Sequence, residues 1–145
     1  MGKVVMVQDT TSHAGKSVLA SALCRIFVQR GLLGAPFKAQ NMSLNSYVTL
    51  DGGEIGCAQA VQAEAAKVVA TVEMNPFLLK PEGNRRSQVV VTGKPRKVAS
   101  AREYYEMKSG LWDVVATSLD RLRAEYDVVV IEGSGQPGRD QPEGA

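Results

Sequence analysis

The chain has 145 residues, of which 44% are hydrophobic and 22% charged, a composition close to that of an average globular domain. Its 17 lysine and arginine residues against 15 aspartate and glutamate residues leave a formal net charge of +2, which gives no electrostatic reason to expect a nucleic-acid partner. No stretch approaches the roughly 20 apolar residues that a membrane span needs, and the chain opens on a strand-like run instead of a signal peptide. We therefore expect a soluble, cytoplasmic protein that contacts neither nucleic acid nor membrane.

The first half of the chain predicts a strand, a loop, a helix and a second strand. Residues 3–7 form a short apolar run with β-branched side chains, which is typical of a buried parallel strand. The pattern becomes helical at Gly15 and continues to Gly31. Residues 34–38 predict the second strand. Residues 39–53 are polar and end in glycine, so they predict a loop, and a loop of that length is usually functional.

The second half alternates helices and strands. Residues 54–69 are rich in alanine and glutamine and predict a helix, followed by an irregular piece around the prolines of 76–81. Residues 88–92 predict a strand, 101–125 a long helix and 127–131 a very apolar strand. This order predicts an α/β fold with a mostly parallel sheet and helices on both faces.

The two cysteines, Cys24 and Cys57, have no metal-ligand spacing between them. Each lies within an apolar, helix-like pattern. Both are therefore predicted to be small core residues, as in a protein from a reducing compartment.

The loop between the first strand and the first helix carries the clearest chemical signal. It ends in Gly15-Lys16-Ser17, and such a loop directs backbone N–H groups and the positive end of a helix dipole at one point, which suits a polyphosphate. Lys16 would reach the β- and γ-phosphates of ATP, and the hydroxyl of Ser17 would coordinate Mg²⁺. A capped helix with an exposed lysine is the alternative. The predicted nucleotide-binding residues are Thr10, Thr11, Ser12, His13, Ala14, Gly15, Lys16 and Ser17.

One position of this loop departs from the usual pattern. The first glycine of a phosphate loop is expected at position 10 or, in an expanded version, at position 9, and these positions hold Thr10 and Asp9. The carboxylate of Asp9 would repel phosphates, and its Cβ restricts a backbone that often needs positive φ. Asp9 therefore lowers the nucleotide affinity that we expect.

Several longer strings extend this signal along most of the chain. With the phosphate loop, and in the same order, they closely resemble the cobyric acid synthase family from about Val4 to Gly135. That family is similar to dethiobiotin synthetase and to cobyrinic acid a,c-diamide synthase, whose P-loop domains activate a carboxylate with ATP. The strings are Phe37 to Ser46, Asp51 to Gly56 followed by Ala58 to Ala60, Met74 to Pro76, Leu79 to Pro81, Ser87 to Val91 and Ile131 to Gly135.

This resemblance implies a P-loop NTPase-like fold and a function in cobalamin biosynthesis. The implied reaction is the ATP- and glutamine-dependent amidation of four peripheral carboxylates of adenosylcobyrinic acid a,c-diamide. The implied cofactors are ATP and Mg²⁺, and the implied partner is this corrinoid substrate. Lys16 and Lys38 are the implied catalytic residues, because Lys38 matches a lysine that in dethiobiotin synthetase faces the γ-phosphate and the substrate carboxylate. An exposed lysine at a strand end is the alternative for Lys38.

The resemblance also suggests metal ligands. Ser17 and Glu132 are the natural pair, since Glu132 ends a buried strand that should lie near the phosphate loop, and Mg²⁺ prefers oxygen ligands. Glu54 resembles an acidic ligand at the start of a helix in dethiobiotin synthetase, and Asp51 competes with it for that role. A charge at a helix N-terminus would explain either residue almost as well.

A neutral, hydrogen-bonding stretch follows Lys38 directly. Its residues Gln40, Asn41, Ser43 and Asn45 are predicted to hold the amides and carboxylates of the corrinoid. Solvation of a loop is the alternative.

The family enzyme is a longer chain with a glutaminase domain that uses a cysteine nucleophile and a His/Glu pair. The one histidine here, His13, belongs to the phosphate loop, so no Cys–His pair is expected and ammonia would come from a domain missing here. We expect residues 1–135 to be a partial P-loop domain, incomplete on its C-terminal side and inactive by itself. Residues 136–145 depart from the family pattern in a way that a one-base frameshift explains, and their Pro/Gly-rich composition predicts disorder.

Two other functions compete with this one. A stand-alone P-loop ATPase switch of the partitioning or metal-chaperone type would need a second lysine near the start of the phosphate loop, and positions 9–14 contain none. A remnant in which Asp9 has removed nucleotide binding is the other.

Overall fold

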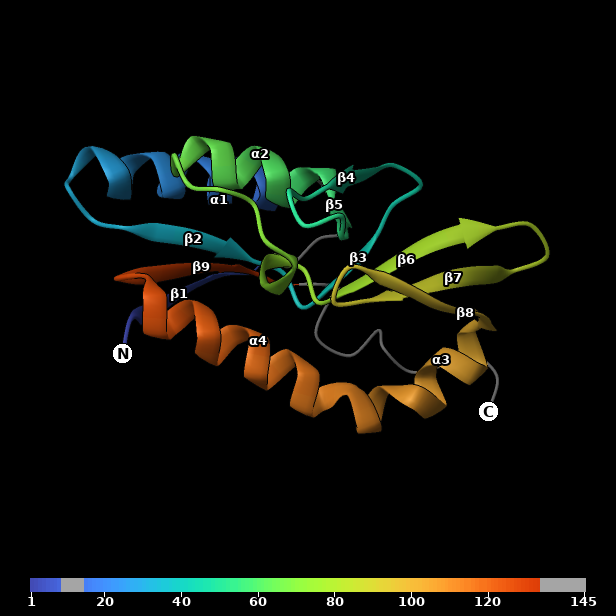
Figure 1. Ribbon diagram of the computed structural model, residues 1–145. Coiled ribbons are helices and arrows are strands. Elements are labelled where there is room, and N and C mark those ends of the chain that lie inside the picture. Colours follow the sequence, from blue (N-terminus) through green and yellow to red (C-terminus); the bar gives the residue numbers. More distant parts are fainter. Residues whose placement is uncertain (9–14, 134–145) are drawn as a thin grey trace.

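The computed structural model describes residues 1–8 and 15–133 and forms three layers around a parallel sheet (Figure 1). Two helices, α1 and α2, lie on one face of this sheet, and α4 lies on the other. The predicted α/β architecture with helices on both faces is therefore confirmed. The bounds are β1 Lys3–Val7, α1 Gly15–Gln29, β2 Gly34–Phe37, α2 Cys57–Ala65, α4 Trp112–Glu125 and β9 Val128–Glu132.

The sheet has the order β1-β9-β2, and both pairings are parallel. In this register Val128 of β9 lies opposite Lys3 on one side and Gly34 on the other. All five residues of β9 are buried, because the strand is central and covered on both faces. The uninterrupted apolar run of its sequence follows from that position.

Small side chains bring α1 close to the sheet. Ala20 and Cys24 are both fully buried and pack against Val7 and Val130. Burial raises the pKa of the Cys24 thiol to about 12, so this group is inert at neutral pH. The prediction that Cys57 is also a core residue is wrong: it begins α2 and is exposed.

The opposite face of the sheet is covered by α4. Leu122 of this helix is 2% exposed and belongs to a cluster with Ala35 and Phe37 of β2 and with Val129 and Ile131 of β9. The helix ends where the backbone N–H of Tyr126 donates to the carbonyl of Leu122, and the chain enters β9 two residues later.

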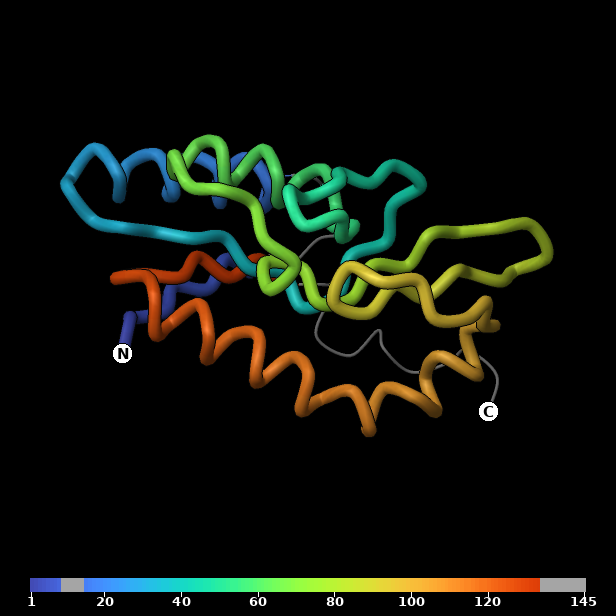
Figure 2. Tube along the Cα trace, viewed as in Figure 1, coloured from blue at the N-terminus to red at the C-terminus, as the bar shows by residue number. Residues whose placement is uncertain are grey.

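A second sheet, which the sequence did not predict, lies beside the first (Figure 2). Its order is β3-β6-β7-β8, with only the β3–β6 pair parallel. The segments expected to be a loop at 39–53 and an irregular piece at 76–81 both contain strands. Pro81 is accepted in the β6–β7 ladder opposite Ser87, and Arg96 is an extra residue of β8 opposite the step from Val89 to Val90, which makes a bulge beside Pro95. The bounds are β3 Gln40–Met42, β6 Phe77–Glu82, β7 Arg86–Val91 and β8 Lys94–Ser100.

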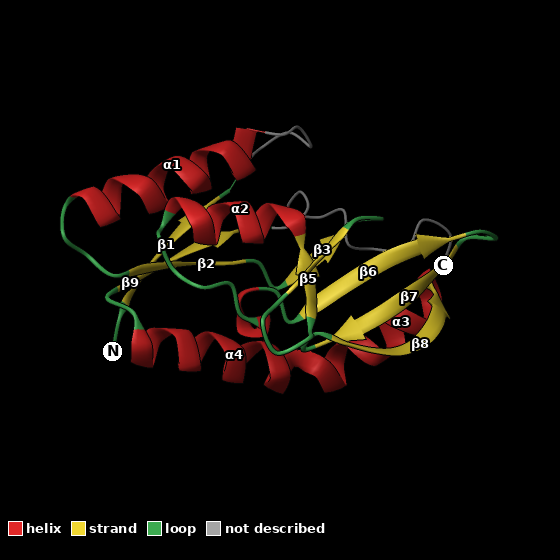
Figure 3. Cartoon of the chain, turned by 45° about the horizontal axis from the view of Figure 1, so that its top comes forward, coloured by secondary structure: helices red, strands yellow, loops and turns green. Residues whose placement is uncertain are grey.

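The helices also differ from their predicted bounds. The segment expected as one helix over 54–69 begins with β5, which pairs antiparallel with β4, and Glu54 lies in that strand and not at a helix start. The segment 101–125 is divided by a 3-10 turn at Ser109–Leu111 into two helices. The first, α3, lies under the second sheet, and the second, α4, lies under the parallel sheet (Figure 3). Within residues 1–8 and 15–133, no helix is both long and apolar enough to cross a membrane. The remaining bounds are β4 Ser46–Val48, β5 Glu54–Gly56, η1 Val72–Met74, α3 Ala101–Lys108 and η2 Ser109–Leu111.

We expect Leu122→Ala to lower the free energy of unfolding by about 2–5 kcal/mol, because it leaves a cavity between α4 and the parallel sheet. Urea denaturation followed by circular dichroism measures this change. Val61→Ala, at a side chain that is 57% exposed on α2, is the matched control and should change the stability by less than about 0.5 kcal/mol. Equal effects of the two substitutions would contradict the packing described for α4.

Candidate functional site

Three predicted site residues meet at the carboxyl edge of the parallel sheet. Lys38 follows the last residue of β2, Glu132 is the last residue of β9, and Ser17 lies in the first turn of α1. The carboxyl ends of parallel strands share one edge, and the helix after β1 begins at that same edge. The fold therefore places a hydroxyl, an ammonium group and a carboxylate around one point.

The carboxylate of Glu132 is the centre of this cluster. Its Oε1 accepts hydrogen bonds from Ser17 Oγ at 2.8 Å and from Lys38 Nζ at 3.2 Å. Its Oε2 accepts a hydrogen bond from Gln62 Nε2 at 3.0 Å. The residue is only 3% exposed, so a buried charge is held by three donors from three different elements.

Burial alone would raise the pKa of Glu132, since it disfavours the charged form. The hydrogen bonds from Gln62 and Ser17 and the positive charge of Lys38 together outweigh burial and hold the pKa below its ordinary value. Glu132 is therefore ionised at neutral pH. With the Lys38 ammonium paired to it, the cluster carries one negative and one positive charge at the edge of the sheet.

Sequence reasoning missed Gln62. Besides Glu132, its Nε2 donates to the carbonyl of Ser17 at 3.3 Å, so it ties α2 to the start of α1. Its Oε1 is buried and has no partner among the residues that the structure describes. The sequence did contain a signal. Gln59 and Gln62 lie three residues apart on the buried face of an alanine-rich helix, where a polar side chain must find hydrogen-bond partners.

The donor set suits Mg²⁺. Ser17 Oγ, the ionised Glu132 carboxylate and the unpartnered Gln62 Oε1 are all oxygen atoms, and Mg²⁺ is usually held by one or two carboxylates together with phosphate and water oxygens. Among the described residues, no group of three or more His, Cys, Asp and Glu residues gathers as a ready-made metal cage. A metal ion here would therefore complete its shell with ligand oxygens and water.

The acidic residues Glu54 and Asp51 lie in other hydrogen-bonded groups. Glu54 Oε1 accepts from Lys80 Nζ at 3.0 Å and from Ser46 Oγ at 2.9 Å, and these hydrogen bonds hold its pKa below the ordinary value. Asp51 accepts from the hydroxyl of Thr49, which likewise lowers the pKa of Asp51. Neither carboxylate shares a described hydrogen-bond partner with Glu132. Their predicted role as metal ligands stays a prediction.

The stretch predicted to hold substrate is fixed at its beginning. The hydroxyl of Tyr104 donates to Gln40 Oε1 at 2.8 Å, and Asn41 Nδ2 donates to Gln59 Oε1 at 3.0 Å. Further along, Ser43 Oγ donates to the carbonyl of Asn45, whose side chain is exposed. Gln40 and Asn41 are thus the first two residues of β3, one residue after Lys38 in the chain, and substrate binding by the four residues remains a prediction.

Asn75 is a second buried residue that sequence reasoning did not assign to the site. It is 1% exposed, accepts a hydrogen bond from the N–H of Gly56 at 2.8 Å and donates to the carbonyls of Lys38 at 3.0 Å and Phe77 at 2.9 Å. One side chain therefore fixes the residue before α2 against the backbone of Lys38. The position of the Lys38 ammonium depends on this side chain.

The remaining predicted residues belong to the phosphate loop. Gly15 begins α1, and Lys16 is partly buried in its first turn. Thr10, Thr11, Ser12, His13 and Ala14, and also Asp9, lie outside the described residues.

Comparison with known proteins identifies the family of the chain. Residues 5–132 match the family described as CbiA, the CobQ/CobB/MinD/ParA nucleotide binding domain. The chain belongs to this family. Membership confirms the P-loop NTPase-like fold and makes the cluster at Glu132 part of a nucleotide-binding domain.

Proteins named cobyric acid synthase are similar to nearly the whole chain, which confirms the predicted resemblance. That of Sorangium cellulosum is 65% identical over 133 residues, which are 92% of this chain and 26% of the relative. Those of Dehalococcoides mccartyi and Pelotomaculum thermopropionicum are 57% and 56% identical over 94% of this chain and 27% and 26% of their own lengths. The chain spans about a quarter of the length of the curated relatives it matches.

We expect Glu132→Gln to lower the free energy of unfolding at neutral pH by about 1–3 kcal/mol, because Lys38 then faces a neutral amide. The folded-state pKa of Glu132 lies below its ordinary value of 4.5, so its stabilising contribution is present above that value and is lost as the pH falls through the folded-state pKa. The difference in stability between parent and variant should therefore shrink on acidification. Urea denaturation at a series of pH values measures it.

Glu106→Gln is the control for this titration. Glu106 pairs with Arg102 on the surface, where its side chain is 65% exposed, so this substitution should change the stability little at any pH. A difference between the parent and Glu132→Gln that is constant with pH would contradict the buried charge.

Proposed function

We propose that this chain is the ATP-binding part of a glutamine-dependent cobyric acid synthase, which activates corrinoid side-chain carboxylates for amidation in cobalamin biosynthesis. The observation that carries the proposal is the cluster in which Ser17 and Lys38 converge on the buried Glu132 at the start of α1. Family membership supports nucleotide binding at this edge, and the names of the relatives support the reaction.

The proposed chemistry is the transfer of a phosphoryl group to a carboxylate. A carboxylate oxygen of the substrate attacks the γ-phosphorus of ATP, the bond to the β-phosphate oxygen breaks, and an acyl phosphate and ADP result. The carboxylate and the phosphates are both anionic, so neutralising charge is most of the catalytic work. Lys16 would bind the β- and γ-phosphates. Lys38, which is ion-paired with Glu132 in the structure, would bind the γ-phosphate and the attacking carboxylate.

Mg²⁺, when bound, would supply further positive charge beside the phosphates. Ser17 and Glu132 would hold it, with Gln62 Oε1 as an additional oxygen, and Glu54 or Asp51 as the more distant acidic candidate. The corrinoid, adenosylcobyrinic acid a,c-diamide, would lie against Gln40, Asn41, Ser43 and Asn45, whose amides and hydroxyl match its neutral and anionic side chains.

The second half of the reaction needs ammonia, which displaces phosphate from the acyl phosphate. We propose that a glutaminase outside this chain supplies it, because Cys24 is buried with a pKa raised to about 12 and the one histidine belongs to the phosphate loop. The chain by itself would therefore bind nucleotide without completing an amidation. Residues 1–135 form the nucleotide-binding part in this proposal, and residues 136–145 take no part in it.

Isothermal titration of the chain with Mg-ATP tests nucleotide binding. We expect measurable binding that Lys16→Ala abolishes at nucleotide concentrations up to about 1 mM, since the loop lysine neutralises the phosphates. Asp9→Gly should tighten binding about tenfold, because it removes a carboxylate that repels them. Lys67→Ala, at a position two residues after α2, is a control that removes one positive charge and should leave the affinity unchanged.

The competing functions predict different results. A remnant that no longer binds nucleotide shows no heat in the parent and recovers binding in Asp9→Gly. A dimerising ATPase switch shows a doubling of mass on addition of Mg-ATP in sedimentation velocity, and no response to the corrinoid. Either result would contradict the proposal.

The metal requirement is tested by Ser17→Ala. We expect this variant to lose about tenfold in affinity for Mg-ATP while its affinity for ATP with excess EDTA stays within about twofold of the parent, because the hydroxyl acts on the metal and not on the phosphates. Equal losses with and without Mg²⁺ would show that Ser17 does not act on a metal ion.

A further inference from the structure

A second ion pair is built like the one at Glu132. Glu54 Oε1 accepts hydrogen bonds from Lys80 Nζ at 3.0 Å and from Ser46 Oγ at 2.9 Å, just as Glu132 Oε1 accepts from a lysine and a serine. The side chains of Lys80 and Glu54 are only 27% and 21% exposed. In the described pairs that involve arginine, by contrast, the arginine is 43% to 90% exposed. The Lys80–Glu54 pair is therefore sheltered, unlike the loose pairs of the surface.

The pair lies on the same side of the second sheet as part of the stretch predicted to hold substrate. Gln40 of β3 is bonded to Tyr104 of α3, so the next side chain, Asn41, lies on the opposite face of the sheet. In the neighbouring strand β6, Leu79 packs in a cluster that includes Tyr104, and Lys80 therefore lies on the face of Asn41. Figure 1 shows β4 and β5 on this side, away from α3.

One buried side chain fixes the pair relative to Lys38. Asn75 accepts a hydrogen bond from the N–H of Gly56 in β5 and donates to the carbonyl of Phe77 in β6, so it is bonded to both strands that carry the pair. The same side chain donates to the carbonyl of Lys38. The pair and the lysine proposed to bind the reacting carboxylate are therefore held in a fixed arrangement.

The pair offers a donor and an acceptor without a net charge. A lysine ammonium has further N–H groups besides the one bonded to Glu54, and Glu54 Oε2 has no partner among the residues that the structure describes. A carboxylate bound here would be attracted by Lys80 and repelled by Glu54, so it would gain little. A primary amide presents a carbonyl to Lys80 and an N–H to Glu54, and both bonds are charge-assisted. The pair therefore favours an amide over a carboxylate.

We propose that Lys80 and Glu54 together bind a side-chain amide of the corrinoid, a role that rests on the function proposed above. The proposed substrate, adenosylcobyrinic acid a,c-diamide, carries amides at positions a and c beside its free carboxylates. Lys80 donates to the amide carbonyl and Glu54 accepts from the amide N–H, while a carboxylate of the same molecule reaches Lys38. Asp51 is then the remaining acidic candidate for the metal ion.

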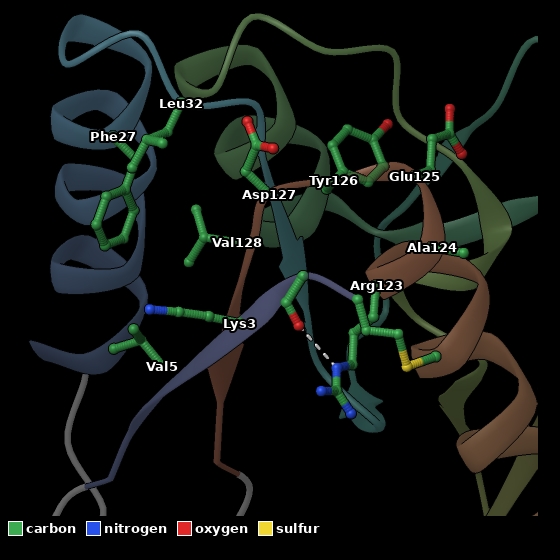
Figure 4. Close-up of a pocket in the computed structure, with 12 residues that line it drawn as sticks. Lys3, Val5, Phe27, Leu32, Arg123, Ala124, Glu125, Tyr126, Asp127 and Val128 are labelled. Carbon is green, nitrogen blue, oxygen red and sulfur yellow. Dashed lines mark hydrogen bonds between the residues drawn. The ribbon is translucent and has the colours of Figure 1, made fainter.

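The pocket of about 620 Å³ shown in Figure 4 does not serve this role. Val128, the first residue of β9, lines it, so it lies at the amino ends of the parallel strands. Lys38 follows the carboxyl end of β2, at the other end of the sheet. Neither Lys80 nor Glu54 lines the pocket. A corrinoid in this pocket would therefore be separated from the proposed site of phosphoryl transfer.

Equilibrium dialysis with two corrinoids tests the proposal. The probes are cobyrinic acid, whose side chains are all free carboxylates, and its a,c-diamide, both in their dicyano forms. We expect the 145-residue chain to bind the diamide at least about tenfold more tightly than the acid. Glu54→Gln should reduce this preference to within about twofold, because the glutamine amide no longer repels a carboxylate.

Lys80→Met should weaken binding of the diamide at least about tenfold, because the amide carbonyl loses a charge-assisted donor. Lys97→Met, at an exposed position of β8, and Glu106→Gln, on α3 at the other face of the sheet, are the charge controls and should leave both affinities within about twofold. Thermal unfolding shows whether each variant is folded. If Lys80→Met is not, Glu54→Gln, which keeps the shape of the side chain, carries the test.

Three results would overturn the proposal. One is equal affinity of the parent for the two corrinoids, and another is a preference that Glu54→Gln leaves intact, which is the result expected of a merely structural ion pair. The third is a loss of more than about tenfold in Mg-ATP affinity in Glu54→Gln, because Glu54 is then a metal ligand. If neither corrinoid binds, the proposed function fails as well, whereas binding without a preference leaves that function standing.

Discussion

The carboxylate of Glu132 is the constraint on which the arrangement of this fold depends. A buried negative charge is stable only when its oxygen atoms are satisfied, and here the donors come from α1, β2's end and α2. Ser17 and Gln62 belong to helices that pack on the parallel sheet, and Lys38 directly follows one of its strands. The same contacts that stabilise the charge therefore fix the start of α1, the lysine after β2 and α2 relative to one another.

A second set of polar contacts extends this control into the substrate side. Asn75 holds the backbone of Lys38 and the start of α2, while Gln59 holds Asn41. Gly56 lies between these side chains, and a Cβ there would collide with Asn41 Nδ2. The second sheet is therefore connected to the nucleotide edge by buried amides, whose bonds are directional and leave little freedom of position.

The sequence predicted the parts of the fold that follow from long apolar runs, namely β1, β2, β9 and the helix after the phosphate loop. It also placed Ser17 and Glu132 together, because Glu132 ends a buried strand that should lie near the phosphate loop, whereas the role of Lys38 came from the family resemblance. The strand predicted at 88–92 is confirmed as β7 of the second sheet, Arg86–Val91. The other strands of this sheet were missed because they are short, polar or interrupted by Pro81 and Pro95, so they lack a clear period. Gln62 and Asn75 were missed because burial of an amide is a tertiary property that local pattern does not show.

The position of β9 also determines when the parallel sheet can form. It lies between β1 and β2, so the first two strands of the chain have no partner in this sheet until residues 128–132 have left the ribosome. Every pairing with β1 spans more than a hundred residues, which makes this sheet a slow, non-local step in folding. The β6–β7–β8 meander, whose pairings are local, can form earlier. During synthesis the apolar β1 therefore stays unpaired for most of the time that the chain is being made, and this interval is when the protein is most exposed to aggregation or to chaperones.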